Sequence, residues 1–398
     1  MKILFLSHRL PYPPNEGSRI RPFNIIKYLA KKHKITVVTL LASKEEWRFV
    51  ELLKEYVDEV ICCLQRPLMR RLKCLATLLS PQTPLSLSYF FSRKLKNLIK
   101  DKLAKEKFDL IFVYSSSMAQ YVIDISRNIP KILDLCDVDS AKWLEYVNYT
   151  QFPYSLIYKL EGLRLRKYEG LITRKFNHCL IISAQEKELL ESITDKGLKI
   201  DILPIGIDYQ LFKRKPKDYT PNTLIITGVM NYYANVDGVN YFYKEIFPLI
   251  KKEIKDVKFY VVGRNPHKSI QKLARDKCVI VTGKVDDVKP YLEKAAVCVV
   301  PLRIARGIQN KILEAMAMGL PVVTTKKAIE GINATDEVEV LIEDNPEEFA
   351  KKTIKLLKDM ELRDKITSNA RKMIEKNYNW GKIVDKLNED VLEKIAIM

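Results

Sequence analysis

Short apolar runs rich in β-branched residues alternate with longer amphipathic stretches along nearly the whole chain, and this alternation restricts the fold more than any other feature. Such runs, bounded by turn residues, predict parallel strands joined by helical crossovers. The expected strands form two successive sets, namely 2–6, 35–41, 57–62, 110–113, 131–135, 179–183 and 200–203, then 223–227, 258–262, 278–282, 298–300 and 322–325. The chain is therefore predicted to be an α/β protein with two doubly wound, Rossmann-like sheets.

Two domains also suit the length of 398 residues, because a single core rarely grows beyond about 300 residues. We expect the first domain at 1–205, a linker at 206–222 and the second domain at 223–378. The linker is polar, with four cationic side chains within 213–217 and two prolines. Helical periodicity continues through the tail to residue 394. Two domains of this class enclose a cleft at the carboxyl ends of their strands, where ligands are expected.

The chain is strongly basic, with 68 Lys and Arg against 49 Asp and Glu. Such a surface attracts phosphates of nucleotides, anionic lipids or nucleic acid. The seven cysteines are scattered, the amino terminus is expected to be a first strand rather than a leader, and no run reaches the about 20 apolar residues of a membrane span. We therefore expect a cytoplasmic protein with free thiols, either soluble or lying on a membrane.

The segment 66–107 concentrates this charge, with eleven Lys and Arg against two acidic residues and with apolar and aromatic residues between them. Two interpretations stay open. The segment docks on the headgroups of an anionic bilayer, or it is a solvated charged face over a buried one. Nucleic-acid binding is not expected, because no recognisable module is present.

The most informative stretch for chemistry is VVPLRIARGIQNKILEAMAMGLPVVTT at 299–325. It predicts a buried strand, a basic loop and a helix that Gly319 and Pro321 terminate. The residues predicted to share one face of this helix are Gly307, Asn310, Lys311 and Glu314.

The amino terminus of this helix suits a diphosphate, because its backbone N–H groups are free and its dipole is positive. Arg303 and Arg306 in the loop would add charge-assisted hydrogen bonds, and the carboxylate of Glu314 could accept hydrogen bonds from a ribose diol. The plainer interpretation is a surface helix with an exposed Lys–Glu pair. The small residues of 315–321 argue against it, since they predict burial on a sheet.

LEAMAMGLPVV at 313–323 resembles the signature of family 4 glycosyltransferases, which have the GT-B fold. The resemblance is closest to the sugar transferases associated with exosortase (PEP-CTERM) exopolysaccharide systems. Blocks that carry it span both predicted domains, at 7–29, 134–143, 160–169, 227–242, 281–292 and 301–323.

The resemblance implies a retaining hexosyltransferase that needs no metal and no cofactor besides its nucleotide-diphosphate sugar. Its acceptor would be an exopolysaccharide or a polyisoprenoid-linked glycan at the inner face of the cell membrane. The helix at 379–398 would cross back to the first domain. The implied donor-site residues are Glu314 for the ribose, Lys311, Arg303 and Arg306 for the diphosphate, Val285 for the base, and Gly17 and Gly228 for close backbone approach.

Several positions depart from the family pattern. Arg306 stands where the wider family has the first of two Glu residues, so a donor-sugar contact is lost or replaced. The Arg and Lys that follow the glycine equivalent to Gly228 are absent, and Met230, Asn231 and Asn235 lie there instead. Arg264 is therefore a further candidate for the diphosphate. A histidine that often ends a middle strand of the first domain is replaced by Tyr114 and serines.

Other candidates carry two interpretations each. Asp137 and Asp139 resemble a metal-binding Asp-x-Asp, but Asp139 also suits a helix cap, and no metal is expected. Asp137 is a candidate for the acceptor side of the cleft, and His8 either touches a ligand or is structural. Helical spacing most simply predicts a salt-bridged helix face formed by Glu161, Arg164, Arg166 and Glu169.

Two other classes of function remain open. Neither a dinucleotide fingerprint nor a Gly-Lys-Ser/Thr phosphate loop is present, which disfavours nicotinamide enzymes and common ATPases. A sugar-nucleotide epimerase of similar fold is one alternative. The other is a catalytically weak scaffold or binding module of a polysaccharide assembly, which Arg306 in place of Glu makes worth testing.

Overall fold

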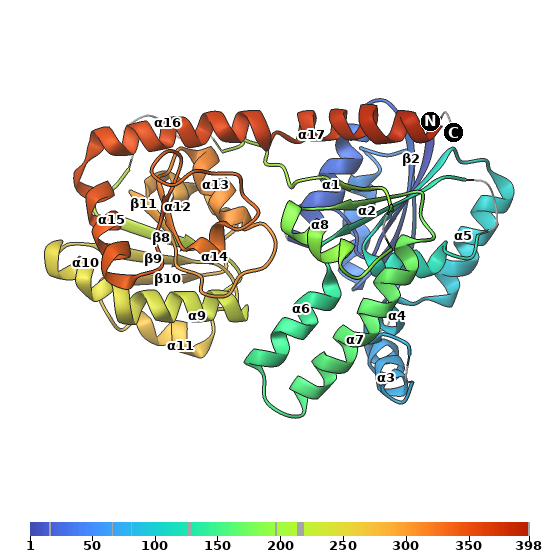
Figure 1. Ribbon diagram of the computed structural model, residues 1–398, viewed down its shortest axis with the longest axis horizontal. Helices are drawn as coiled ribbons and strands as arrows, with labels where there is room; N and C mark the ends of the chain where they lie inside the picture. The colour runs from blue at the N-terminus through green and yellow to red at the C-terminus, as the bar shows by residue number, and fades with distance from the viewer. Residues whose placement is uncertain are drawn as a thin grey trace. The chain divides into compact units, whose positions relative to one another are not determined.

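The computed structural model describes residues 1–15, 17–65, 67–80, 82–125, 129–195, 197–212 and 219–396. Contacts along the chain divide it into two units, one formed by Met1–Ile205 with Trp380–Met398 and the other by Gly206–Asn379 (Figure 1). The cationic part of the predicted linker, 213–218, lies outside the described residues. No helix within the described part of the chain is both long and apolar enough to cross a membrane.

The first unit contains a parallel sheet of seven strands in the order β3-β2-β1-β4-β5-β6-β7. The strands are β1 (Lys2–Ser7), β2 (Lys34–Leu41), β3 (Glu59–Leu64), β4 (Leu110–Tyr114), β5 (Lys131–Cys136), β6 (His178–Ile181) and β7 (Ile200–Ile202). Each predicted strand is confirmed, with ends that differ by one or two residues. The direction of winding reverses between β1 and β4, so loops after these strands open a crevice at the carboxyl edge.

Helices cover both faces of this sheet. They are α1 (Gly17–Leu29), α2 (Trp47–Leu53), α3 (Pro67–Leu78), α4 (Leu85–Phe90), α5 (Arg93–Lys105), α6 (Asp139–Tyr146), α7 (Tyr154–Thr173) and α8 (Ala184–Glu191). The end of the chain joins them, because α17 (Trp380–Leu387) packs against α1. A π-helical turn over 388–392 and α18 (Glu393–Ala396) follow it. Lys32 pairs with Asp385 at 3.1 Å, and the His33 ring nitrogen Nε2 lies 2.6 Å from Oδ1 of Asn388.

A fully buried ion pair fastens α1 to the sheet. Arg21 donates from Nε and Nη2 to the two carboxylate oxygens of Asp134, at 2.8 and 3.0 Å. Its Nη1 donates to the carbonyl of Leu203 at 2.6 Å. The guanidinium therefore joins α1, β5 and the segment after β7, and fixes the start of α1 beside the crevice.

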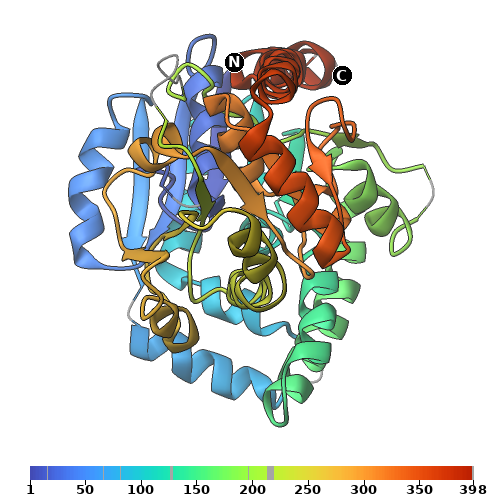
Figure 2. The same ribbon diagram turned by 90° about the vertical axis from the view of Figure 1, so that its left-hand side faces the viewer.

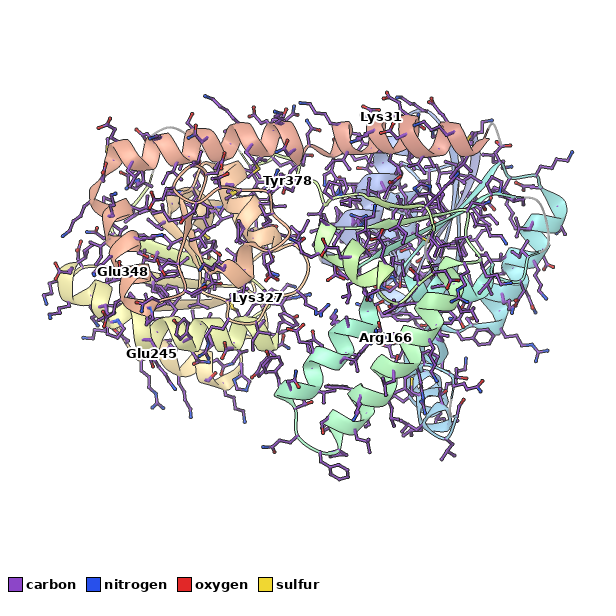
Figure 3. All side chains as sticks on the ribbon, viewed as in Figure 1. Lys31, Arg166, Glu245, Lys327, Glu348 and Tyr378 are labelled. Carbon is purple, nitrogen blue, oxygen red and sulfur yellow. The ribbon has the colours of Figure 1, made fainter. Side chains whose placement is uncertain are left out.

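The predicted salt-bridged face on α7 is wrong, because three of its four residues are buried and bind backbone groups of other elements. Glu161 accepts from the backbone N–H groups of Leu85 and Ser86, at 2.5 and 2.9 Å. Arg164 donates to the carbonyl of Thr77 at 3.3 Å. Glu169 accepts from Ser140 N at 3.1 Å. Arg166 alone of the four is exposed (Figure 3).

The second unit contains a six-stranded parallel sheet in the order β10-β9-β8-β11-β12-β13. Its strands are β8 (Thr223–Thr227), β9 (Lys258–Val262), β10 (Val279–Gly283), β11 (Val297–Val300), β12 (Val322–Thr324) and β13 (Leu341–Ile342). All are confirmed predictions except β13, which has two residues and therefore no periodicity to detect. Winding reverses between β8 and β11.

Helices also cover both faces of the second sheet (Figure 2). They are α9 (Tyr233–Tyr241), α10 (Phe247–Glu253), α11 (Lys268–Leu273), α12 (Lys289–Lys294), α13 (Asn310–Met318), α14 (Lys326–Ile329), α15 (Pro346–Lys358) and α16 (Met360–Asn377). The helical tail predicted over 346–376 is thus two helices. They separate at Asp359, whose extended backbone lets its carboxylate cap α16 through Leu362 N.

Candidate functional site

The carboxyl ends of β8, β9 and β11 meet where the second sheet reverses its winding, which is where ligands bind in doubly wound folds. Gly228 follows β8, Gly263 and Arg264 follow β9, and the basic loop over 301–309 follows β11. The topology therefore gathers most of the predicted donor-site residues at one edge of one sheet.

Two glycines let the backbone turns after β8 and β9 pack directly on each other. Gly228 has φ +154° and donates its N–H to the carbonyl of Val262 at 3.1 Å. A Cβ on Gly263, where φ is +151°, would lie 1.7 Å from the carbonyl oxygen of Gly228. No side chain fits at Gly263, so both positions require glycine. The sequence indicates a role for Gly228 but not for its partner Gly263, because a lone glycine after a strand has no motif around it.

Lys311 places a buried ammonium at this edge. It lies in the first turn of α13, and its Nζ donates to Oδ1 of Asn235 on α9. Asn235 is itself held, because its Nδ2 donates to the carbonyl of Val229 at 3.0 Å. The same Nζ lies 3.4 Å from the position that a Cβ on Gly228 would occupy. Burial lowers the pKa of Lys311 to about 8, although Cys298 and Glu314 act in the opposite direction.

Glu314 lies one helical turn after Lys311. Part of the residue is exposed, but its carboxyl group lies below the surface, and this burial raises the pKa of Glu314 to about 7 against the effect of nearby Lys311. Asn310 is the first residue of the same helix. The predicted face of Asn310, Lys311 and Glu314 is therefore present, with a cation in the first turn and a carboxyl group beyond it.

Gly307 does not share this helical face, contrary to prediction. Its φ of +62° is left-handed, and α13 begins only at Asn310. The loop of Arg306 and Gly307 is closed instead by Gln309, whose Nε2 donates to the carbonyl of Arg306 at 3.1 Å. A run of helical spacing cannot reveal a left-handed residue within it, since spacing carries no information on φ.

The other cations of the donor-site prediction have different surroundings. Arg303 is paired with Asp237 of α9, with Nε 3.0 Å from Oδ2, and its guanidinium lies 4.6 Å from the ring centre of Tyr241. Its charge is already balanced within the unit. Arg264 and Val285 are partly exposed in the loops that follow β9 and β10.

The remaining candidates belong to the first unit. Gly17 opens α1, and a Cβ there would meet no atom within 4 Å. Asp137 follows β5 at the carboxyl edge of the sheet, with its Oδ2 3.9 Å from Sγ of Cys136. Within the described residues, no three His, Cys, Asp or Glu side chains gather as metal ligands would.

Asp139 does not cap α6, so that interpretation is wrong. The helix begins at Asp139 itself, whose Oδ2 accepts from the Ser116 hydroxyl at 3.1 Å. Glu186 and Glu169, from α8 and α7, accept the backbone N–H groups of Val138 and Ser140 instead, at 2.8 and 3.1 Å. Carboxylates distant in sequence therefore accept the hydrogen bonds of the backbone N–H groups at the start of this helix.

Known proteins resemble both the second unit and the whole chain. Residues 221–359, which lie in the second unit, match the family described as glycosyl transferases group 1. A Klebsiella pneumoniae protein described as an uncharacterized 44.6 kDa protein in the cps region is 22% identical over 402 residues, covering 97% of this chain and 98% of its own.

Two solved structures resemble the whole chain. Sucrose-phosphate synthase from Thermosynechococcus elongatus has a TM-score of 0.74 at 16% identity and covers 100% of both chains. Anabaena Alr3699/HepE, solved in complex with UDP-glucose, has a TM-score of 0.68 at 16% identity, covering 99% of this chain and 100% of its own. The predicted GT-B class of two doubly wound Rossmann-like domains is confirmed, and the second unit contains a glycosyl transferase group 1 domain.

Proposed function

We propose that this chain is a retaining glycosyltransferase that takes a hexose from a nucleotide-diphosphate sugar without the help of a metal. The observation that supports it most is the ammonium of Lys311, held by Asn235 beside the backbone of Gly228 and one turn from the carboxyl group of Glu314. We assign the ammonium to the diphosphate and the carboxyl group to the ribose that follows it. Because Anabaena Alr3699/HepE, a protein of similar fold, was solved with UDP and with UDP-glucose, uridine nucleotides are the first donors to test.

In the reaction we propose, the bond between the sugar's anomeric carbon and the diphosphate oxygen breaks, and the electron pair leaves with the phosphate. Lys311 and the amino terminus of α13 stabilise the negative charge that develops there, in positions set before the charge appears. The acceptor oxygen bonds to the same face of the anomeric carbon. Its proton passes to the departing phosphate oxygen, so no protein nucleophile is needed.

The family's basic pair after the glycine is absent from this chain, and Lys311 explains how the donor can still be bound. Asn235, one of the replacements, accepts a hydrogen bond from the ammonium that α13 supplies. A cation thus reaches the backbone of Gly228 from another element. Arg306 lies in the adjoining loop, where it can meet the sugar or the diphosphate in place of the family's carboxylate.

We propose an exopolysaccharide or a polyisoprenoid-linked glycan as the acceptor. The match to a protein of a cps region supports a polysaccharide, and the resemblance to exosortase-associated transferases supports the same class. Such acceptors are reached from the membrane surface, so the proposed location is the cytoplasm with peripheral attachment to the inner face of the cell membrane.

Exposed apolar side chains on the first unit support this attachment. Leu75 and Leu79, in and after α3, are 61% and 90% exposed, and Phe152 and Tyr154, at the start of α7, are 79% and 62% exposed. Figures 1 and 2 show α3 and the α6–α7 hairpin extending from the same side of the unit. Exposed Arg71, Arg93 and Lys94 supply positive charge nearby in the chain.

Replacing both Leu79 and Phe152 by Asp is expected to weaken binding to vesicles of phosphatidylglycerol and phosphatidylcholine by about tenfold or more, because apolar burial is lost and charge repulsion is added. Flotation in a density gradient measures it. A matched control places Asp at Leu211 and Met360, which are 60% and 57% exposed in the second unit. An equal loss in both variants would refute an attachment through α3 and the α6–α7 hairpin.

A thermal-shift screen tests the donor site. We expect sugar nucleotides of one base to raise the melting temperature, because a ligand at 100 times its Kd adds about 2.7 kcal/mol to the free energy of unfolding. The rise is expected to be equal with and without magnesium. No shift with any nucleotide would favour the scaffold hypothesis. Isomerised sugar or free nucleotide formed without an acceptor would favour the epimerase.

A further inference from the structure

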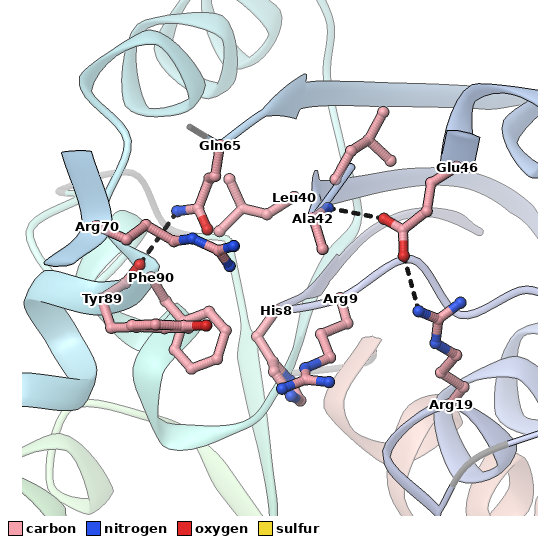
Figure 4. Close-up of a pocket in the computed structure, with 11 residues that line it drawn as sticks. His8, Arg9, Arg19, Leu40, Ala42, Glu46, Gln65, Arg70, Tyr89 and Phe90 are labelled. Atoms are coloured by element: carbon pink, nitrogen blue, oxygen red, sulfur yellow. Dashed lines mark hydrogen bonds and ion pairs between the residues drawn. The ribbon is translucent and has the colours of Figure 1, made fainter. Parts of the chain in front are cut away.

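A polar pocket lies in the first unit, at the carboxyl edge of its sheet. Its volume is about 140 Å³, and residues that follow β1 and β2, together with side chains of α1, α3 and α4, line it (Figure 4). The charged and aromatic residues of its wall are His8, Arg9, Arg19, Glu46, Arg70 and Tyr89.

The wall of this pocket is positively charged. Among the described residues that line it, three are arginines and Glu46 is the only carboxylate. Both oxygens of Glu46 are engaged, since one accepts from Nη2 of Arg19 and the other from the backbone N–H of Ala42, each at 2.7 Å. The carboxylate therefore holds Arg19 in place and leaves the pocket with an excess of cations.

Buried polar atoms of this wall lack partners. Within the described structure, Nδ1 of His8 and the Nε atoms of Arg19 and Arg70 are buried without a hydrogen bond. A buried polar atom without a hydrogen bond destabilises the fold unless a ligand or water satisfies it. The three come from the end of β1, from α1 and from α3, so they approach the pocket from different elements. A ligand with several acceptor oxygens would satisfy them together.

We propose that this pocket binds a phosphate group, and that in the proposed transferase reaction this phosphate belongs to the acceptor. Hydrogen-bond donors that approach from three elements suit a tetrahedral oxyanion better than a planar carboxylate, whose acceptor positions lie in one plane. Leu40 and Phe90 form an apolar side of the same pocket, which fits the carbon chain attached to a lipid-linked phosphate. The assignment to the acceptor rests on the proposed function, whereas phosphate binding itself does not.

His8 provides a spectroscopic reporter for this pocket. Its ring stacks on Tyr114 and meets Phe90 edge-on, with centroids 5.7 and 5.0 Å apart. Burial, together with nearby Arg9 and Lys142, lowers the pKa of His8 to about 3. A bound anion favours the imidazolium, so phosphate is expected to raise this pKa and to shift the ring resonances of His8. The chain has only four histidines, so the signals can be assigned by substitution.

Arg70 and its neighbour Arg71 give a matched pair for the test. Both lie on α3, but Arg70 lines the pocket over the ring of Tyr89, at 4.8 Å, and Arg71 is exposed. Arg70→Gln is expected to weaken binding of inorganic pyrophosphate by about tenfold or more in calorimetry, and to abolish the pyrophosphate-induced shift of His8 in NMR spectra. Arg71→Gln is expected to change neither. Equal effects of both variants, or no shift of His8 in the unaltered protein, would overturn the proposal.

Competition between ligands distinguishes the source of the phosphate. A short-chain polyprenyl diphosphate is expected to compete with inorganic pyrophosphate for this pocket and to bind together with a nucleotide sugar. If UDP displaces pyrophosphate from the pocket in an Arg70-dependent way, the phosphate belongs to the donor and the acceptor assignment is wrong. The Lys311→Met variant tests the donor proposal independently of this pocket. It removes a cation of the other unit, so it is expected to leave pyrophosphate binding in this pocket unchanged.

Discussion

Lys311→Met is expected to weaken donor binding strongly while making the folded protein more stable. The ammonium is buried and donates to Asn235, and within the described residues it forms no ion pair with a carboxylate. Methionine has similar length and no charge to desolvate. We expect affinity for a sugar nucleotide to fall about 100-fold, because a charge-assisted contact to the diphosphate is lost from a buried position.

The gain in stability has a defined pH dependence. Because burial lowers the pKa of Lys311 to about 8 from its usual 10.5, the folded state binds this proton less tightly than the unfolded state. The free-energy cost of burying the charged lysine is therefore fully present below pH 8, and it disappears as the pH rises towards 10.5. At pH 7, Lys311→Met should raise the free energy of unfolding by about 1 kcal/mol, after allowance for the lost hydrogen bond to Asn235.

Urea unfolding and calorimetric titration of the same samples test both parts of this prediction. Lys372→Met is the matched control, because Lys372 is exposed on α16 of the same unit. It should change neither stability nor donor affinity appreciably. Donor binding that persists within a factor of about three in Lys311→Met would refute the diphosphate role. A loss of stability would show that the ammonium is needed for the fold instead.

The affinity for a nucleotide sugar is expected to follow a bell-shaped pH profile whose two limbs belong to Glu314 and Lys311. Ribose hydroxyls donate to a carboxylate better than to a carboxylic acid. Since burial raises the pKa of Glu314 to about 7, affinity should fall below that pH. Since burial lowers the pKa of Lys311 to about 8, affinity should fall above that pH as the ammonium is lost. The diphosphate group of a nucleotide sugar does not itself change its ionisation in this range.

Glu314→Gln keeps the shape of the side chain but removes its charge. We expect it to weaken donor binding by about 1–3 kcal/mol at pH 8 and to eliminate the acid limb while leaving the alkaline limb in place. Calorimetric titrations between pH 5.5 and 9.5, at about half-unit steps, would resolve the two limbs. Glu253→Gln, at an exposed position of α10, controls for the change in net charge. An unchanged acid limb in Glu314→Gln would rule out the ribose role.

Much of the fold could be predicted because its causes are local. A buried parallel strand needs a short apolar run and an amphipathic crossover needs helical periodicity, so both sheets could be read along the chain. Gly319 ends α13 in a left-handed conformation, with φ +74°, where a glycine was expected to stop the helix. The helical face of Lys311 and Glu314 also follows from spacing alone.

The parts that could not be predicted depend on partners far away in the sequence. Glu161 and Glu169 have the spacing of a surface ion-pair network, yet both are buried. Their carboxylates accept hydrogen bonds from backbone N–H groups 76 and 29 residues away in the sequence. The left-handed turn at Gly307 depends on φ, which apolar periodicity does not report.

The sequence by itself determined two doubly wound sheets, the helix that follows β11 and the residue types of the proposed donor site, because strand and helix periodicities act over a few residues. Only the tertiary structure placed Nζ of Lys311 on Asn235, 76 residues away, and Gly263 against Gly228. It alone gathered His8, Arg19 and Arg70 around one pocket. Burial, the resulting pKa values and the pairing of charges depend on which elements pack together, and no local pattern encodes them.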